Sequence, residues 1–180
     1  MPKRMLIGLT GLAGSGKSTI ASNLVLEHGF RRHRFAGPLK DMLRALGLTD
    51  AQIDGEHKEV ACEELGWNTP RYAMQTLGTE WGRAHMGPNF WVNLAKARIK
   101  DDLLRASVVV DDVRFQNEVE AIRAMGGRVL RVVRPGTAGA GSHVSESQDF
   151  DVDGTIGNSG SLDELRAEIW AVIGLLREAA

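Results

Sequence analysis

The residues best suited to chemistry stand near the start of the chain, where glycines surround a lysine and a hydroxyl. Residues 11–18 read Gly-Leu-Ala-Gly-Ser-Gly-Lys-Ser, which matches the phosphate-binding pattern G-x-x-x-x-G-K-[ST]. Glycines let consecutive backbone N–H groups curl around a phosphate, while the lysine reaches the outer phosphates of a nucleoside triphosphate. The pattern predicts an ATP site with Lys17 as a catalytic residue and Ser18 as a ligand of Mg²⁺. The predicted ATP contacts in this segment are Gly11, Ala13, Gly14, Ser15, Gly16, Lys17, Ser18 and Thr19.

Two adjacent carboxylates follow the β-branched run 108–110. Such a run predicts a central strand, so Asp111 and Asp112 would lie at its carboxyl end, beside the phosphate loop. A strand followed by aspartate is common, and taken alone it is typical of a turn or a helix cap. Beside a phosphate loop, one of the two is expected close to Mg²⁺ or its waters. Spacing does not separate them: both are catalytic candidates, and Asp111 is the candidate metal ligand.

Arginine outnumbers lysine by 16 to 6. Phosphoryl transfer needs such groups, because charge on several phosphate oxygens is neutralised best by rigid, bidentate donors. The alternative is that these arginines are solvated surface residues. The arginines predicted in or near loops and element ends are Arg71, Arg83, Arg114, Arg131 and Arg134.

The elements that must position these residues alternate between strand and helix. Short apolar or β-branched runs predict strands at residues 5–10, 32–35, 108–110, 128–133 and 155–156. Helical spacing and capping signals predict helices at residues 17–28, 38–46, 69–85, 91–105 and 119–125, and from a capping box at 161–164 onward. This alternation predicts an α/β fold with three layers around a parallel sheet.

The organisation expected from this reading is one domain over residues 1–180. A mostly helical insertion is predicted at residues 38–106, after the second strand. Within it, residues 50–68 are polar and acid-rich, so we expect a surface excursion rather than core. Residues 135–153 are rich in glycine, serine and acid, which predicts a lid-like loop.

Composition excludes several classes of protein. Of 180 residues, 43% are hydrophobic and 25% charged, values typical of globular chains rather than disordered ones. The net charge of −1 predicts no bulk attraction to nucleic acid or to a membrane surface. No apolar stretch is long enough to cross a bilayer. The single cysteine, Cys62, cannot form an internal disulfide, which fits a cytoplasmic location.

Five segments together resemble one family of enzymes. They are Gly14–Thr19, Phe35–Lys40, Arg71 with the run Gln75–Glu80, Phe90-Trp91, and Asp112–Glu118. In combination they resemble the bacteriophage deoxynucleoside monophosphate kinases, a branch of the nucleoside monophosphate kinase superfamily. The resemblance runs from about residue 5 to residue 170 and implies a P-loop kinase fold with a helical substrate-binding insertion.

The resemblance implies transfer of the γ-phosphate of ATP, with Mg²⁺, to a deoxynucleoside 5′-monophosphate. Lys40 and Arg71 would clamp the acceptor phosphate, with Arg71 also catalytic, and Trp91 would pack against the sugar or base. Asn117 and Glu118 would hydrogen-bond a base edge, although Asn117 capping a helix and Glu118 complementing its dipole is a competing interpretation. The full implied acceptor site comprises Leu39, Lys40, Arg71, Gly78, Trp91, Asp112, Val113, Gln116, Asn117 and Glu118.

The sequence departs from the superfamily in the region where a lid closes. Kinases of this kind usually carry arginines there, whereas residues 135–150 contain neither Arg nor Lys. The stabilising charge would then come from Arg114, Arg131 or Arg134 at the edge of the loop. Arg114 is therefore a catalytic candidate, and Arg134 a candidate contact of ATP.

Other functions fit parts of the same pattern. A P-loop kinase of another small molecule, such as dephospho-coenzyme A, would need a carboxylate base, for which Asp41 or Asp112 could serve. A nucleotide-dependent switch or a DNA-associated ATPase would share the phosphate loop, but neutral charge disfavours it. A glycine-rich turn that binds no nucleotide is the simplest alternative. The sequence leaves a homodimer open.

Overall fold

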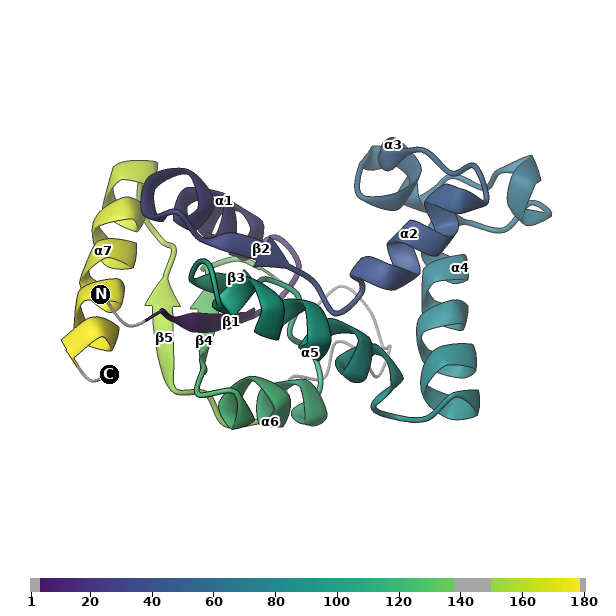
Figure 1. Ribbon diagram of the computed structural model, residues 1–180. Helices are drawn as coiled ribbons and strands as arrows, with labels where there is room; N and C mark the ends of the chain where they lie inside the picture. The colour runs from purple at the N-terminus through teal and green to yellow at the C-terminus, as the bar shows by residue number, and fades with distance from the viewer. Residues whose placement is uncertain (1–3, 138–149, 179–180) are drawn as a thin grey trace. The chain divides into compact units, whose positions relative to one another are not determined.

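The computed structural model describes residues 4–137 and 150–178 and divides the chain into two compact units (Figure 1). The sheet unit comprises residues 1–34 and 96–180, and the helical unit comprises residues 35–95. The boundary at residues 95 and 96 falls inside one helix, α5 (Phe90–Leu103). Each unit has its own internal packing and is described separately.

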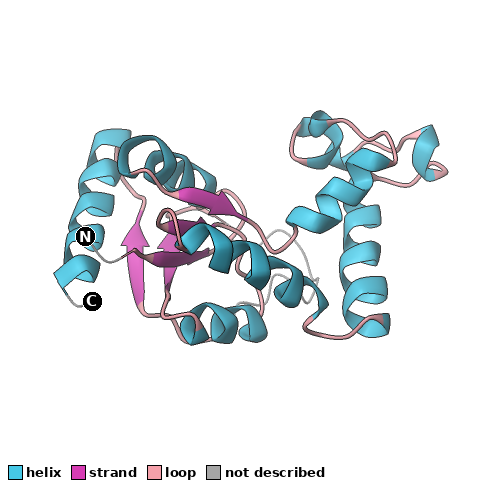
Figure 2. Cartoon of the chain, in the orientation of Figure 1, coloured by secondary structure: helices cyan, strands magenta, loops and turns pink. Residues whose placement is uncertain are grey.

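The sheet unit carries five strands, all of them parallel to their neighbours (Figure 2). The order across the sheet is β2-β3-β1-β4-β5. The strands are β1 (Leu6–Thr10), β2 (Arg31–His33), β3 (Val108–Val110), β4 (Arg128–Val133) and β5 (Gly154–Gly157). The helices of this unit, besides α5, are α1 (Lys17–His28), α6 (Gln116–Ala124) and α7 (Leu162–Glu178). The predicted α/β parallel-sheet fold is confirmed.

Apolar residues on alternate strand positions bury the sheet against helices on each face. On one face, Ile7 and Leu9 of β1 belong to a buried cluster with Ile20 of α1 and Ile169 of α7. On the other face Gly8 allows a close approach, since a Cβ at this residue would lie 2.5 Å from the side chain of Ile122 in α6. The sheet is therefore the middle of three layers, and its strand ends are held rigidly.

The helical unit is built from short helices around a small core. Its elements are α2 (Gly37–Ala45), α3 (Asp50–Ile53), η1 (Glu56–Glu59), η2 (Glu63–Leu65), α4 (Pro70–Gln75) and the π-helix η3 (Thr76–His85). Leu43, Leu48 and Ile53 are buried together, with Leu77 packed against them. The expectation that residues 50–68 are surface rather than core is wrong at Ile53, which is fully buried. A capping box at Thr49, with Gln52 as its partner, starts the short helix that places Ile53 in this core.

The helix predicted over residues 69–85 changes type along its length. Thr69 caps its start, where its hydroxyl accepts a hydrogen bond from the Tyr72 amide, and Pro70 occupies the first turn. From Thr76 onward the turns widen to those of a π-helix. Among the described helices, none combines the length and the apolar character needed to span a bilayer.

Candidate active site

The phosphate loop joins β1 to α1. At two of its positions the backbone adopts a conformation that only glycine tolerates well. Gly11 has φ +139° and lies so close to β4 that a Cβ would be 2.4 Å from the Val132 carbonyl oxygen. Gly16, with φ +104°, precedes the first residue of α1. The N-terminus of α1 therefore opens directly onto the loop, where its amides and partial positive charge favour an anion.

Lys17 lies folded along the loop. Its ammonium donates hydrogen bonds to the carbonyl oxygens of Gly11 at 2.6 Å and of Leu12 at 2.8 Å. Burial, and then the charge of Arg114, lower the pKa of this ammonium, while Asp111 and Asp112 act against the change. Arg114, Asp111 and Asp112 therefore lie near enough to Lys17 for their charges to act on its ammonium.

The two predicted metal ligands come together at the carboxyl edge of the sheet. Asp111 follows β3 directly and is only 4% exposed. The Ser18 hydroxyl, in the first turn of α1, donates to its Oδ2 across 3.4 Å. A carboxylate oxygen next to a hydroxyl oxygen is a hard donor set of the kind that Mg²⁺ uses together with nucleotide phosphates. The chemistry of this pair fits Mg²⁺, and Ser18 and Asp111 remain the candidate magnesium ligands.

Two arginines that the sequence reasoning missed also contact Asp111. Arg34 donates through Nε to Oδ1 at 3.1 Å, and Arg32 pairs through Nη2 with Oδ2. Burial acts to raise the pKa of this carboxyl, but the hydrogen bonds and charges of Arg32 and Arg34 outweigh it and hold the pKa below its ordinary value. Two residues apart, Arg32 and Arg34 point to the same face of an extended strand. This spacing could have identified both arginines as partners of Asp111 if the pairing of β2 with β3 had been predicted from the sequence.

Asn158 is a third residue that the sequence reasoning missed. Its side-chain amide donates to the Ser15 carbonyl oxygen at 2.8 Å, and its backbone amide donates to the Val133 carbonyl oxygen at 2.8 Å. It therefore ties the end of β5 and the end of β4 to the phosphate loop. The φ of +104° favours glycine at residue 16, and a Cβ there would also lie 2.3 Å from the Asn158 amide nitrogen.

The residues predicted around the lid lie at the end of β4. Arg131 donates through Nη2 to the Phe150 carbonyl oxygen at 2.9 Å, and its guanidinium lies 5.9 Å from the centre of the Phe150 ring. Arg134 is exposed, and its carbonyl oxygen accepts from the Thr137 hydroxyl at 2.7 Å. Most of the predicted lid, residues 138–149, lies outside the described residues, so the lid remains a prediction.

The segment from Asp112 to Glu118 leaves the sheet and starts α6. Glu118 is buried, and its Oε2 accepts from the backbone amides of Arg114 at 2.7 Å and Phe115 at 3.2 Å. Glu118 thus acts at the start of the helix, in line with the competing interpretation, but the N-cap residue is Phe115, so the expectation that Asn117 caps the helix is wrong. Val113 is fully buried, whereas Gln116 is exposed and bonds Glu120 of the same helix. Asp112 and Asn117 are half-buried beside them.

Three predicted acceptor residues meet inside the helical unit. Trp91 donates its indole N–H to the Gly78 carbonyl oxygen at 2.8 Å, and a Cβ at Gly78 would lie 3.6 Å from the Leu39 side chain. Trp91 is only 4% exposed, and its ring packs so closely on Gly82 that a Cβ there would come within 2.4 Å. The observed contacts of Trp91 are therefore internal to the protein, in contrast to the expected contact with sugar or base.

The two predicted acceptor-phosphate cations pair with separate carboxylates in the same unit. The Lys40 ammonium lies 2.5 Å from Asp54, and the Arg71 guanidinium pairs with Glu59. The Arg71 side chain is nearly half exposed, and that of its partner Glu59 is more than half exposed. Such an exposed pair is weak, so Arg71 can exchange its carboxylate for a phosphate at little cost.

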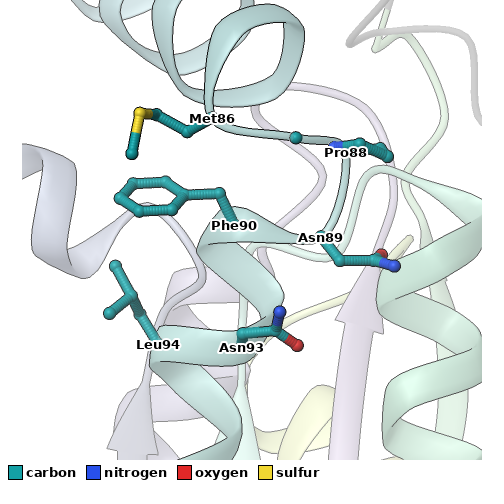
Figure 3. A pocket seen from close by; sticks show the side chains of 7 residues that line it. Met86, Pro88, Asn89, Phe90, Asn93 and Leu94 are labelled. Carbon is teal, nitrogen blue, oxygen red and sulfur yellow. The ribbon is translucent and has the colours of Figure 1, made fainter.

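A pocket of about 340 Å³ opens in the helical unit around the turn before α5 (Figure 3). Phe90 forms part of its wall and also meets Trp91 edge to face, with ring centres 4.8 Å apart. Figure 3 shows Met86, Phe90 and Leu94 on one side and the amides of Asn89 and Asn93 on the other. The wall is thus mostly apolar with two amide groups.

The fold and the phosphate loop together define a P-loop protein of the kinase class. Solved kinases share the fold: shikimate kinase from Aquifex aeolicus has a TM-score of 0.54 at 14% identity, over 98% of this chain and 100% of that one. Dephospho-CoA kinase from Campylobacter jejuni has a TM-score of 0.50 at 14% identity, over 97% and 98% of the two chains. At such low identity these likenesses describe the fold alone.

Sequence relatives are more specific. Residues 50–169 match the family described as deoxynucleotide monophosphate kinase. The deoxynucleotide monophosphate kinase of Enterobacteria phage T4 is 36% identical, over 91% of this chain and 96% of its own. A relative in Acanthamoeba polyphaga mimivirus is 34% identical, over 92% and 94% of the two chains. The chain belongs to the deoxynucleotide monophosphate kinase family, as its motifs had indicated.

Proposed function

We propose that this protein transfers the γ-phosphate of ATP, with Mg²⁺, to a deoxynucleoside 5′-monophosphate, releasing ADP and the deoxynucleoside diphosphate. The observation that carries the proposal is the meeting of Ser18 and Asp111, 3.4 Å apart, beside the lysine of the phosphate loop. The family to which the chain belongs supports the choice of acceptor.

The proposed reaction requires positioned groups and positive charge, but it requires no general base. The acceptor is an ionised phosphate oxygen, which forms a bond to the γ-phosphorus while the bond to the β,γ-bridging oxygen breaks. Ser18 and Asp111 would hold Mg²⁺, which would supply positive charge to neutralise the nucleotide phosphates. Lys17 would leave its loop carbonyls for the phosphates, and Arg114 and Arg134 would balance charge that develops during transfer.

The acceptor would bind at the helical insertion, predicted at residues 38–106. Lys40 and Arg71 would bind its phosphate, and Leu39, Gly78 and Trp91 would form the packed wall behind it. Asp112, Gln116 and Asn117 remain candidates for the sugar and the base edge. Residues 135–153 would act as the lid, and we place the enzyme in the cytoplasm, where a lone cysteine stays reduced.

A turnover panel tests the proposal. Each of the four common deoxynucleoside monophosphates, and modified pyrimidine monophosphates, is offered with ATP and Mg²⁺ while ADP formation is followed. We expect ADP only when a suitable monophosphate is present. ADP formation without an acceptor would indicate a hydrolytic switch, and turnover with dephospho-coenzyme A alone would place the chain among hydroxyl kinases.

A further inference from the structure

One buried carboxylate in the sheet unit is held by two guanidinium groups at once. Arg34 Nε bonds one oxygen of Asp111, and Arg32 Nη2 bonds the other, which also accepts from the Ser18 hydroxyl. Both oxygens are therefore fixed by donors from two different elements, β2 with the residue after it and α1. The Asp111 side chain is 3% exposed, and those of Arg32 and Arg34 are 26% and 27% exposed.

Simple stabilisation of the sheet does not require this arrangement. A single guanidinium would balance the charge of one buried carboxylate, whereas here two guanidinium groups hold opposite oxygens of the same carboxylate. Bidentate and forked donors also fix direction, because each N–H must point at its acceptor. The cluster thus determines the direction in which the two oxygens of Asp111 face.

We propose that Arg32 and Arg34 are positioning residues that hold the two oxygens of Asp111 aligned with Ser18, so that the magnesium-binding pair is formed before nucleotide arrives. The inference rests on the proposed magnesium role of Asp111 and Ser18. Partners that orient a metal ligand typically change metal affinity about 10- to 100-fold when removed. The arginines act on the metal through Asp111 and supply no metal ligand themselves.

The same strand offers a matched control. Arg31 pairs with Asp102 of α5, and His33 bonds the same carboxylate at 2.6 Å. Arg31 is adjacent to Arg32, so its side chain points to the opposite face of β2. Loss of Arg31 removes a guanidinium–carboxylate pair from the same strand and leaves the Asp111 cluster intact.

The test measures ADP affinity by calorimetry in the presence of MgCl₂ and again in EDTA, on the full chain. The ratio of the two affinities isolates the contribution of the metal from that of general charge. We expect Arg32→Gln and Arg34→Gln to reduce this ratio about 10- to 100-fold. Arg31→Gln should keep the affinity ratio of the native protein, even if its melting temperature falls as much as those of the Arg32 and Arg34 variants. Arg32→Lys and Arg34→Lys retain the positive charge but lack the planar guanidinium, so we expect them to give intermediate affinity ratios. These two variants also provide the test if a Gln variant does not fold.

Asp111→Asn separates failure of the inference from failure of the proposed function. If Asp111→Asn keeps the native ratio, the metal assignment is wrong and the inference falls with it. If Asp111→Asn abolishes the magnesium effect while the Arg32 and Arg34 variants keep it, the assignment stands and the positioning role is overturned. An equal fall in the Arg31→Gln control would also overturn it, because the effect would then be general to the strand.

Discussion

At the scale of single residues, Lys17 is the side chain with the clearest expected role. Its ammonium bonds two carbonyl oxygens of the loop and faces no part of the core. We expect Lys17→Ala to reduce phosphoryl transfer on the order of a hundredfold or more while the fold persists, because its charge serves phosphate. Steady-state turnover together with a thermal melt measures both effects. Near-native turnover by the folded variant would remove the loop lysine from the mechanism.

Arg71 tests the acceptor side of the proposed reaction. A lost bidentate contact to phosphate costs about 1.5 to 3 kcal/mol, equivalent to roughly a tenfold or greater loss of affinity. Arg71→Ala should therefore raise the KM of the monophosphate by tenfold or more and change that of ATP much less. Glu59→Gln is the companion variant, since it frees Arg71 from its present partner and should leave acceptor binding intact. A change confined to the KM of ATP would move Arg71 to the donor site.

Glu118 separates base reading from helix capping. Its carboxylate is buried and accepts two backbone amides at the start of α6. We expect Glu118→Gln to lower the free energy of unfolding by about 1 kcal/mol, as loss of a good cap does, and to leave the ranking of monophosphate acceptors unchanged. A thermal melt and the acceptor panel measure the two outcomes. A changed ranking of acceptors would indicate that Glu118 contacts the base. An unchanged ranking would indicate that the residues that recognise the base lie within residues 50–91.

At the scale of elements, α5 is attached to β2 through one carboxylate. Asp102 bonds His33 and Arg31. These contacts, chiefly the hydrogen bond with His33, hold the pKa of Asp102 below its ordinary value of 3.8. A carboxyl whose pKa is lowered by folding stabilises the folded state above its unfolded pKa, and this stability is lost as pH falls through the folded value. The melting temperature of native protein should exceed that of Asp102→Asn at neutral pH, and the gap should shrink below about pH 3.8. A gap independent of pH would show that packing, not charge, makes the attachment.

Strands and helices could be predicted from the sequence where the local residue pattern determines their structure. The fully buried β1 and β3 are short apolar runs, and α7 begins at a capping box that the structure shows between Ser161 and Glu164. The π-helix η3 was not predictable, because apolar spacing does not distinguish its wider turns from those of an α-helix. Ile53 was missed for a similar reason: in a four-residue helix no periodicity can develop.

At the scale of the whole molecule, the fold could be predicted and much of the site could not. Alternating strands and helices suffice for a parallel α/β sheet, and the phosphate loop is a contiguous motif. The partners of Asp111 come from β2, and Asn158 reaches Ser15 from the far end of the chain. Such pairs depend on strand order, which local spacing does not contain. Family resemblance supplied candidate acceptor residues but not their contacts within the protein, as the buried ring of Trp91 illustrates.

The central place of β1 in the sheet has a consequence for how the chain is made. Leu6 pairs with Val108 and Ile7 with Arg128, so the first strand acquires its neighbours only when residues more than a hundred positions later have been synthesised. The contacts inside residues 35–95 need no such wait. Pairings this distant slow folding because a long loop must close first. On the ribosome, the helical unit can acquire its structure while β1 is still without a sheet, and the apolar Leu6–Thr10 segment is the part of the nascent chain most exposed to aggregation.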